Sequence, residues 1–117
     1  MQYMLLIYES EANLGKMSEQ ERGAMFAEYM KFTDDIRKSG RFLAGAPLQP
    51  TPTATTVRVR DGKRLTTDGP FAETKEQLGG YYLVDAKDLD EAMALAARIP
   101  SARLGSIDVR PVMAMNG

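Results

Sequence analysis

Two chemically versatile side chains are missing from this chain: its 117 residues include no cysteine and no histidine. Without cysteine there is no disulfide and no thiol nucleophile, and this absence is typical of a protein of the reducing cytoplasm, where we expect it. Without histidine there is no imidazole base, no Ser-His pair, and no ordinary zinc or copper site. Only oxygen ligands for a hard cation remain. We therefore predict neither a metal site nor a cofactor.

Long hydrophobic runs and a strong net charge are also missing. The N-terminal apolar run, Tyr3 to Tyr8, has only six residues, too few for a signal peptide or a membrane span. The net charge of −1 provides no field that attracts nucleic acid or anionic lipid. We predict a soluble protein that binds neither nucleic acid nor membrane. The length predicts a single domain over residues 1–117, with a loose tail at 113–117.

Hydrophobic periodicity predicts four strands, two helices and one inserted hairpin. The strands Tyr3 to Tyr8 and Gly80 to Ala86 are apolar on both alternating sets, as expected for strands buried on both faces. A polar connection, 9–17, precedes a helix that begins at the capping box of Ser18 and Glu21. The remaining predicted elements are the end of that helix at about Ser39, a strand over 41–48, a second helix capped by Asp88 and ended by Pro100, and a strand over 106–112.

The hairpin is predicted over 53–60 and 63–67, about Asp61-Gly62. A two-residue loop would place Val57 opposite Thr66. A three-residue loop would place Val57 opposite Leu65 and keep the apolar side chains together. We prefer the second register, because register usually follows the buried face.

The order of these elements is that of an α+β, ferredoxin-like split βαβ sandwich with an inserted β-hairpin. Two helices cover only one face of a four-stranded sheet, yet the strands at 3–8 and 80–86 are apolar on both faces. An uncovered second face would expose more apolar surface than a monomer usually tolerates. We therefore expect a two-fold homodimer packed sheet against sheet. The alternative is that the hairpin or the tail folds back over that face.

Four segments carry a resemblance to a known family: "YMLLIYE", "GAPLQPTPTATTVRVRDG", "TDGPFAETKEQLGGYYLVDAKDLDEA" and "GSIDVRPV". Together they resemble the DGPF-domain proteins of the YCII-related family. The resemblance implies a dimeric α+β barrel of ferredoxin-like subunits in a bacterial protein, often encoded beside an extracytoplasmic-function sigma factor. Some relatives carry a His-Asp pair proposed as catalytic. Because this chain has no histidine, the resemblance implies no enzyme activity for it.

The DGPF turn has a structural interpretation. Asp68 is expected to accept backbone hydrogens in an Asx turn, while Gly69 and Pro70 set the backbone and Phe71 anchors the loop in the core. Gly79-Gly80 is expected to form a β-bulge, or else to allow a close backbone approach.

The same segment is also the predicted ligand site, because charges gather there beside a buried strand. We expect a ligand to contact the residues Asp68, Gly69, Glu73, Lys75, Glu76 and Tyr81. Asp68, Lys75 and Tyr81 are the candidate catalytic residues: an acid or base, an anion holder or desolvated base, and a phenol donor.

Three functions follow. The leading one is a homodimeric small-ligand-binding or accessory protein. The second is a cofactor-independent enzyme, such as an isomerase, lyase or monooxygenase-like protein, with Asp, Lys or Tyr moving a proton. The third is an interaction module for a sigma factor, in which the basic hairpin, with Arg58, Arg60, Lys63 and Arg64, makes the contact.

Overall fold

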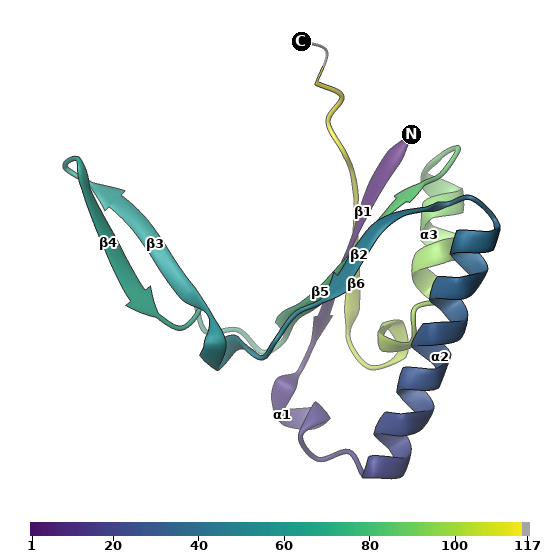
Figure 1. Ribbon diagram of the computed structural model, residues 1–117, viewed down its shortest axis with the longest axis horizontal. Helices are drawn as coiled ribbons and strands as arrows, with labels where there is room; N and C mark the ends of the chain where they lie inside the picture. The colour runs from purple at the N-terminus through teal and green to yellow at the C-terminus, as the bar shows by residue number, and fades with distance from the viewer. Residues whose placement is uncertain (116–117) are drawn as a thin grey trace.

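A four-stranded antiparallel sheet forms the centre of the computed structural model, which describes residues 1–115. The strand order is β2-β5-β1-β6, and both long helices lie on one side of the sheet (Figure 1). This confirms the predicted ferredoxin-like α+β class. The elements are β1 (Gln2–Glu9), α1 (Glu11–Leu14), α2 (Glu19–Lys38), β2 (Phe42–Pro47), the 3₁₀ turn η1 (Thr51–Thr53), β3 (Thr55–Arg60), β4 (Lys63–Asp68), β5 (Gln77–Asp85), α3 (Leu89–Ala97), the 3₁₀ turn η2 (Pro100–Arg103) and β6 (Ser106–Pro111).

The helix starts follow their predicted caps. The Ser18 hydroxyl accepts from the Glu21 backbone, and the Glu21 carboxylate accepts from the Ser18 backbone. Asp88 likewise accepts from the Glu91 backbone. The predicted polar connection also contains α1, a short helix missed from the sequence and capped by the Ser10 side chain. Of the predicted tail, residues 113–115 lie outside any helix or strand, and 116–117 lie outside the described residues.

The core lies between the sheet and the two helices. Alternate residues of β1, Tyr3, Leu5 and Ile7, are buried against the helices. They meet Tyr82 and Val84 of β5 in a cluster that also contains Phe32, Ile36, Ala92, Leu95, Ala96 and Ile99. The rings of Phe32 and Tyr82 meet edge to face at 5.3 Å.

The opposite face of the sheet is apolar and has no helix over it. Met4 pairs with Leu83 and Leu6 pairs with Tyr81, and all four side chains are only half-buried. The hairpin extends away from the sheet (Figure 1), and Met113 is 78% exposed. The alternative in which the hairpin or tail covers this face is therefore wrong for residues 1–115.

The preferred hairpin register was also wrong, since Val57 pairs with Thr66. Asp61 and Gly62 both have positive φ, 52° and 73°, as in the two-residue type I′ loop whose twist matches that of paired strands. Val57 and Val59 are 57% and 63% exposed, so this subunit offers no buried face that selects a register. The turn decides the pairing instead.

Two close backbone approaches determine where segments meet near the end of β1. The predicted bulge at Gly79-Gly80 is confirmed: Ile7 pairs with Gly80 and Tyr8 with Leu78, so Gly79 is the extra residue. Gly105, which follows η2, lies so near β1 that a β-carbon there would be 2.1 Å from the Tyr8 carbonyl oxygen. Only glycine fits at this contact, which holds η2 against β1.

Among residues 1–115, the structure has no helix whose length and apolar character would let it span a membrane.

Candidate functional site

Two adjoining cavities lie between α2 and the sheet, at the end where β1 finishes. Their volumes are about 510 Å³ and 360 Å³. Both are lined by Glu9, Phe26, Tyr29 and Gly79, so we treat them as one cleft, the α2 cleft. Volumes of this size are typical of small-molecule sites.

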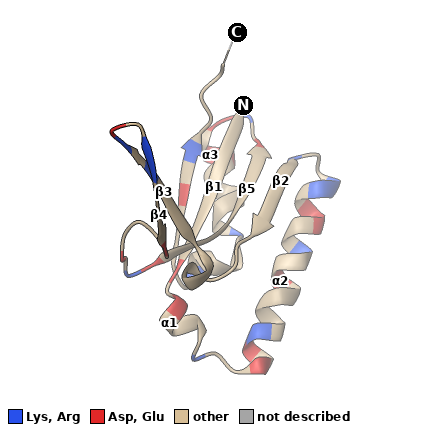
Figure 2. Ribbon diagram, turned by 60° about the vertical axis from the view of Figure 1, so that its left-hand side comes forward, with Lys and Arg blue, Asp and Glu red and all other residues tan. Residues whose placement is uncertain are grey.

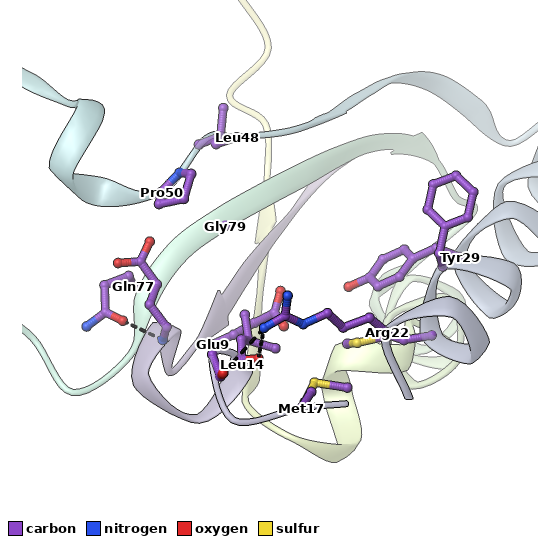
Figure 3. A pocket seen from close by; sticks show the side chains of 13 residues that line it. Glu9, Leu14, Met17, Arg22, Tyr29, Leu48, Pro50, Gln77 and Gly79 are labelled. Atoms are coloured by element: carbon purple, nitrogen blue, oxygen red, sulfur yellow. Dashed lines mark hydrogen bonds between the residues drawn. The ribbon is translucent and has the colours of Figure 1, made fainter. Parts of the chain in front are cut away.

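The larger cavity has apolar walls and a few polar groups (Figure 3). Its apolar lining residues are Leu14, Met17, Met25, Phe26, Leu48 and Pro50. Three of its polar residues already have partners that hold the local fold. Glu11 accepts from the Thr51 backbone at 2.8 Å, and the Gln77 side chain accepts from the Glu11 backbone at 2.9 Å. Arg22 donates to the carbonyl oxygens of Leu14 and Gly15 and so closes the end of α1.

Glu9, the last residue of β1, is a half-buried carboxyl group at the wall of both cavities. It makes no ion pair among residues 1–115. The bulge makes room for it, since a β-carbon on Gly79 would be 3.3 Å from the Glu9 Oε1. Burial raises the pKa of Glu9, and the influence of the Ser101 side chain partly offsets the rise. A carboxyl of this kind is suited to accept a proton.

Tyr29 of α2 directs its hydroxyl into the cleft (Figure 3) and shares a 2.5 Å hydrogen bond with Ser101 Oγ. Ser101 is fully buried in η2. Burial raises the pKa of Tyr29 to about 12, and the nearby charge of Glu9 adds to the rise. The Tyr29 phenol therefore remains protonated at neutral pH and acts as a hydrogen-bond donor.

The smaller cavity adds a second pair of hydroxyls and a cation. Thr33 Oγ1 and the Tyr82 hydroxyl are 2.7 Å apart, and Thr33 Oγ1 also donates to the Tyr29 carbonyl at 2.9 Å. The Arg37 guanidinium lies 4.6 Å from the centre of the Phe42 ring. Burial raises the pKa of Tyr82, against the lowering effects of Thr33 and Arg37.

The DGPF turn lies apart from the α2 cleft lining, at the base of the free-standing hairpin. Asp68 ends β4 and is exposed. Gly69 has a φ of 94°, and its backbone donates to the Ala54 carbonyl at 2.7 Å, which confirms its role in the turn. Phe71, however, is 79% exposed, so its predicted burial in the core was wrong. The loop leads from an exposed hairpin to β5 and does not cross the core.

The predicted ligand residues are only partly brought together. Glu73 and Lys75 are exposed, and Glu76 accepts a hydrogen bond from the Ser106 hydroxyl at 2.9 Å. Neither cavity of the α2 cleft is lined by Asp68, Gly69, Glu73, Lys75 or Glu76. Tyr81 lines the smaller cavity, although it pairs with Leu6 on the opposite face of the sheet.

Sequence reasoning missed Glu9, Tyr29 and Ser101. Glu9 had one usable signal, because it is an acidic residue directly after a strand apolar on both faces. Tyr29 belongs to the apolar stripe of α2, and this pattern predicts a core residue and not a site residue. Ser101 gives no signal at all. Among residues 1–115, no three acidic side chains are grouped as metal ligands.

Comparison with known proteins places the chain in context. Residues 1–116 match the model of the YCII-related domain. An uncharacterised protein from Rhizobium meliloti (strain 1021) is 37% identical over 114 residues, covering 96% of this chain and 92% of that protein. The solved structure of 5-chloro-2-hydroxyhydroquinone dehydrochlorinase from Burkholderia phenoliruptrix AC1100, in complex with 2,5-dihydroxybenzoquinone, aligns with a TM-score of 0.57 at 15% identity, covering 97% of this chain and 94% of that one. This likeness shows a shared fold.

The raised pKa of Glu9 predicts a pH-dependent stability difference between the wild type and Glu9→Gln. Because the folded-state pKa is raised, the contribution of Glu9 is most favourable below the unfolded pKa, about 4.3, and is lost as pH rises through the folded pKa. Glu9→Gln should therefore melt higher than the wild type at pH 7, roughly by a few degrees at most. The gap should close toward pH 4. Thermal melts at fixed protein concentration measure this, with the exposed Glu73→Gln as control. A Glu9→Gln variant that melts lower at pH 7 would contradict the interpretation.

Proposed function

We propose, from the premise that this chain belongs to the YCII-related family, that it is a small-ligand-binding protein whose ligand occupies the α2 cleft. The observation that carries the proposal is the set of Glu9, Tyr29 and the Ser101 behind them, at the wall of a mainly apolar cavity whose other polar residues, Glu11, Arg22 and Gln77, already have partners. A few convergent polar groups in an apolar concavity are typical of ligand sites. The fold itself makes no use of a half-buried, unpaired carboxyl, so its burial cost needs another reason.

The walls favour a flat, ring-sized ligand that carries a hydroxyl or carbonyl. Phe26 and the methionines contact an apolar body, while Glu9 accepts a hydrogen bond and Tyr29 donates one. The dehydrochlorinase of similar fold binds 2,5-dihydroxybenzoquinone, which supports a ligand of this size.

A cofactor-independent enzyme is the second candidate, and the raised pKa of Glu9 beside a neutral phenol favours it. An isomerase or lyase reaction needs one group that takes a proton and one that stabilises the resulting oxyanion. Glu9 and Tyr29 supply both. The predicted Asp68, Lys75 and Tyr81 remain the alternative catalytic set.

A thermal-melting screen against a metabolite library distinguishes a ligand site in the α2 cleft from one at the DGPF loop. Ligands that stabilise the wild type should lose most of their shift, about tenfold in affinity, in Glu9→Gln, since one hydrogen bond to a charged group is removed. The shift should be unchanged in Asp68→Asn and Lys75→Met. A shift lost in the latter two and kept in Glu9→Gln would move the site to the DGPF loop.

We further propose that the protein is a homodimer, packed through the apolar sheet face opposite the helices. The radius of gyration is 16.3 Å, against about 13 Å for a compact domain of this length. The hairpin causes the excess and extends on the side away from the helices (Figure 1). A subunit with an uncovered apolar face and an isolated two-stranded arm is incomplete on its own.

The two sides of the hairpin support the same proposal. Val57 and Val59 share one side, because residues directly opposite and alternate residues point the same way. Arg58, Arg60 and Lys63 lie on the other side together with Leu65, whereas Arg64, opposite Val59, lies on the valine side. β3, with six residues, spans about 20 Å, enough to cross the sheet of a second subunit. In the proposed dimer, the side with the two valines contacts the sheet of the second subunit, and the side with Arg58, Arg60 and Lys63 faces solvent.

Leu83→Lys should convert the dimer to a monomer, because it places a charge at the centre of the proposed interface. Light scattering after gel filtration should give one chain, 12.9 kDa, for the variant and twice that mass for the wild type. Met93→Lys, on the exposed side of α3, is the matched control and should remain dimeric. Circular dichroism checks that both variants fold. A folded Leu83→Lys dimer would exclude this face.

The contact with a sigma factor is a third proposal, which also presumes the predicted cytoplasmic location. Its support is the basic side of the hairpin (Figure 2). Replacing Arg58 and Arg60 with glutamate should abolish co-purification with an acidic partner of this kind. Unchanged co-purification would count against the contact.

A further inference from the structure

We infer that the α2 cleft carries opposite charges at its two ends and takes a ring-bearing carboxylic acid, with the ligand's carboxylate on Arg37 and its hydroxyl on Glu9. The inference rests on the proposed ligand site in the α2 cleft and adds the charge and the length of the ligand. Glu9 and Arg37 are the two charged residues among those that line the smaller cavity.

The two charges lie at opposite ends of the smaller cavity. Tyr29, which lines both cavities together with Glu9, precedes Arg37 by eight residues of α2, about 12 Å along the helix axis. The sheet also separates them. A β-carbon on Gly79 would contact Glu9, whereas Phe42, the ring beside Arg37, pairs with Val84 about 16 Å further along β5. A ligand that reaches both charges is therefore longer than a single ring.

The Arg37 guanidinium is held in position but is not neutralised. It lies 4.6 Å from the centre of the Phe42 ring, and it makes no ion pair among residues 1–115. The next residue, Lys38, pairs with Asp34 four positions earlier, whereas the residue four positions before Arg37 is the neutral Thr33. Arg37 is exposed, so it stays charged in the free protein at little cost. Its planar fork of N–H donors matches the two oxygens of a carboxylate.

Between the two ends, two hydroxyl groups already have their hydrogens engaged. Thr33 has one hydroxyl hydrogen and donates it to the Tyr29 carbonyl at 2.9 Å. The Tyr82 hydroxyl, 2.7 Å from Thr33 Oγ1, therefore donates to Thr33. Phe26 and Met30 add apolar surface to the same cavity. This middle part suits an apolar ligand body with its polar groups at the ends.

The two charges also determine the orientation of the ligand. A ligand hydroxyl donates to the ionised Glu9, whereas a ligand carboxylate at that end would meet a like charge. At the other end the same carboxylate meets the Arg37 cation. The reversed orientation loses a favourable contact at both ends, so the cleft should distinguish an acid from its neutral amide.

Three probes test the Arg37 end by titration calorimetry: 3-(4-hydroxyphenyl)propionate, its primary amide, and the shorter acid 4-hydroxybenzoate. The wild type should bind the propionate about fivefold more tightly than the amide at low salt, because Arg37 is exposed and its pairing is screened. The preference should shrink at about 1 M salt. Arg37→Gln should bind the propionate as weakly as the amide and should leave the affinity for the amide unchanged. 4-Hydroxybenzoate should lose less in this variant, because its carboxylate stops short of Arg37.

The neighbouring cation provides the matched control. Lys38→Gln removes the same charge from a residue that does not line the cavity, so it should keep the preference for the acid. Arg37→Lys should keep only part of the preference, since it retains the charge but not the fork. Glu9→Gln should weaken binding of the amide about tenfold, because it removes the charged acceptor of the ligand hydroxyl. Circular dichroism checks that each variant folds.

The outcomes separate the role of Arg37 from the site itself. If the wild type binds neither the propionate nor its amide, the proposed ligand site is overturned for this class of compound, and the inference with it. If the wild type binds both equally, and Glu9→Gln weakens both, the role of Arg37 is overturned and the site stands. A preference for the acid that survives in folded Arg37→Gln would also overturn that role. So would an equal loss in Lys38→Gln, since the charge would then act through the general field of the protein.

Discussion

The contact of Gly105 with the end of β1 is the constraint on which the cleft depends. Any side chain at this position would collide with the Tyr8 carbonyl oxygen, at 2.1 Å. Because the backbones meet there, η2 lies against β1 and carries the buried Ser101 to a position behind both Glu9 and Tyr29. The Gly79 bulge then leaves space for the carboxylate on the other side. A polar site is thus built from backbone proximity in a region whose surroundings are apolar.

The two proposed surfaces lie on opposite sides of one sheet. The cleft uses the helix side, where Ile7 and Tyr82 line its floor. The proposed dimer uses the side of Leu6 and Leu83. Strand alternation separates them, since neighbouring residues of β1 point in opposite directions. The proposed ligand site and the proposed dimer face therefore use mostly different residues of the same strands; Tyr81, which lines the smaller cavity and pairs with Leu6, is the exception.

Periodicity and capping predicted most of the fold, because these signals are local. The apolar strands, the Ser18 cap and the Gly79-Gly80 bulge are determined by residues within a few positions of one another. The hairpin register failed because a rule based on burial was applied to strands that this subunit leaves exposed. The predicted burial of Phe71 was wrong for a related reason, since it assumed that an apolar residue reaches the core.

The candidate site was not predictable in the same way. Glu9, Tyr29 and Ser101 are separated by up to most of the chain and meet only through the packing of η2 on β1. The charge-rich segment around Asp68 drew attention because its charges are adjacent in sequence. Those charges are mostly exposed. Exposed charges have little effect on the free energy of folding, so their presence is weak evidence for a functional site. One half-buried carboxyl without a cation is more informative about a site than several solvated ones.

The most direct test of the central claim is a carbon-13 NMR titration of the Glu9 side-chain carboxyl. The pKa of Glu9 should lie above that of the exposed Glu73 in the same spectrum, because burial disfavours the ionised form. In Ser101→Ala it should rise further, because the side chain that lowers the Glu9 pKa is gone. A Glu9 pKa at or below that of Glu73, unmoved by Ser101→Ala, would contradict a half-buried carboxyl influenced by Ser101.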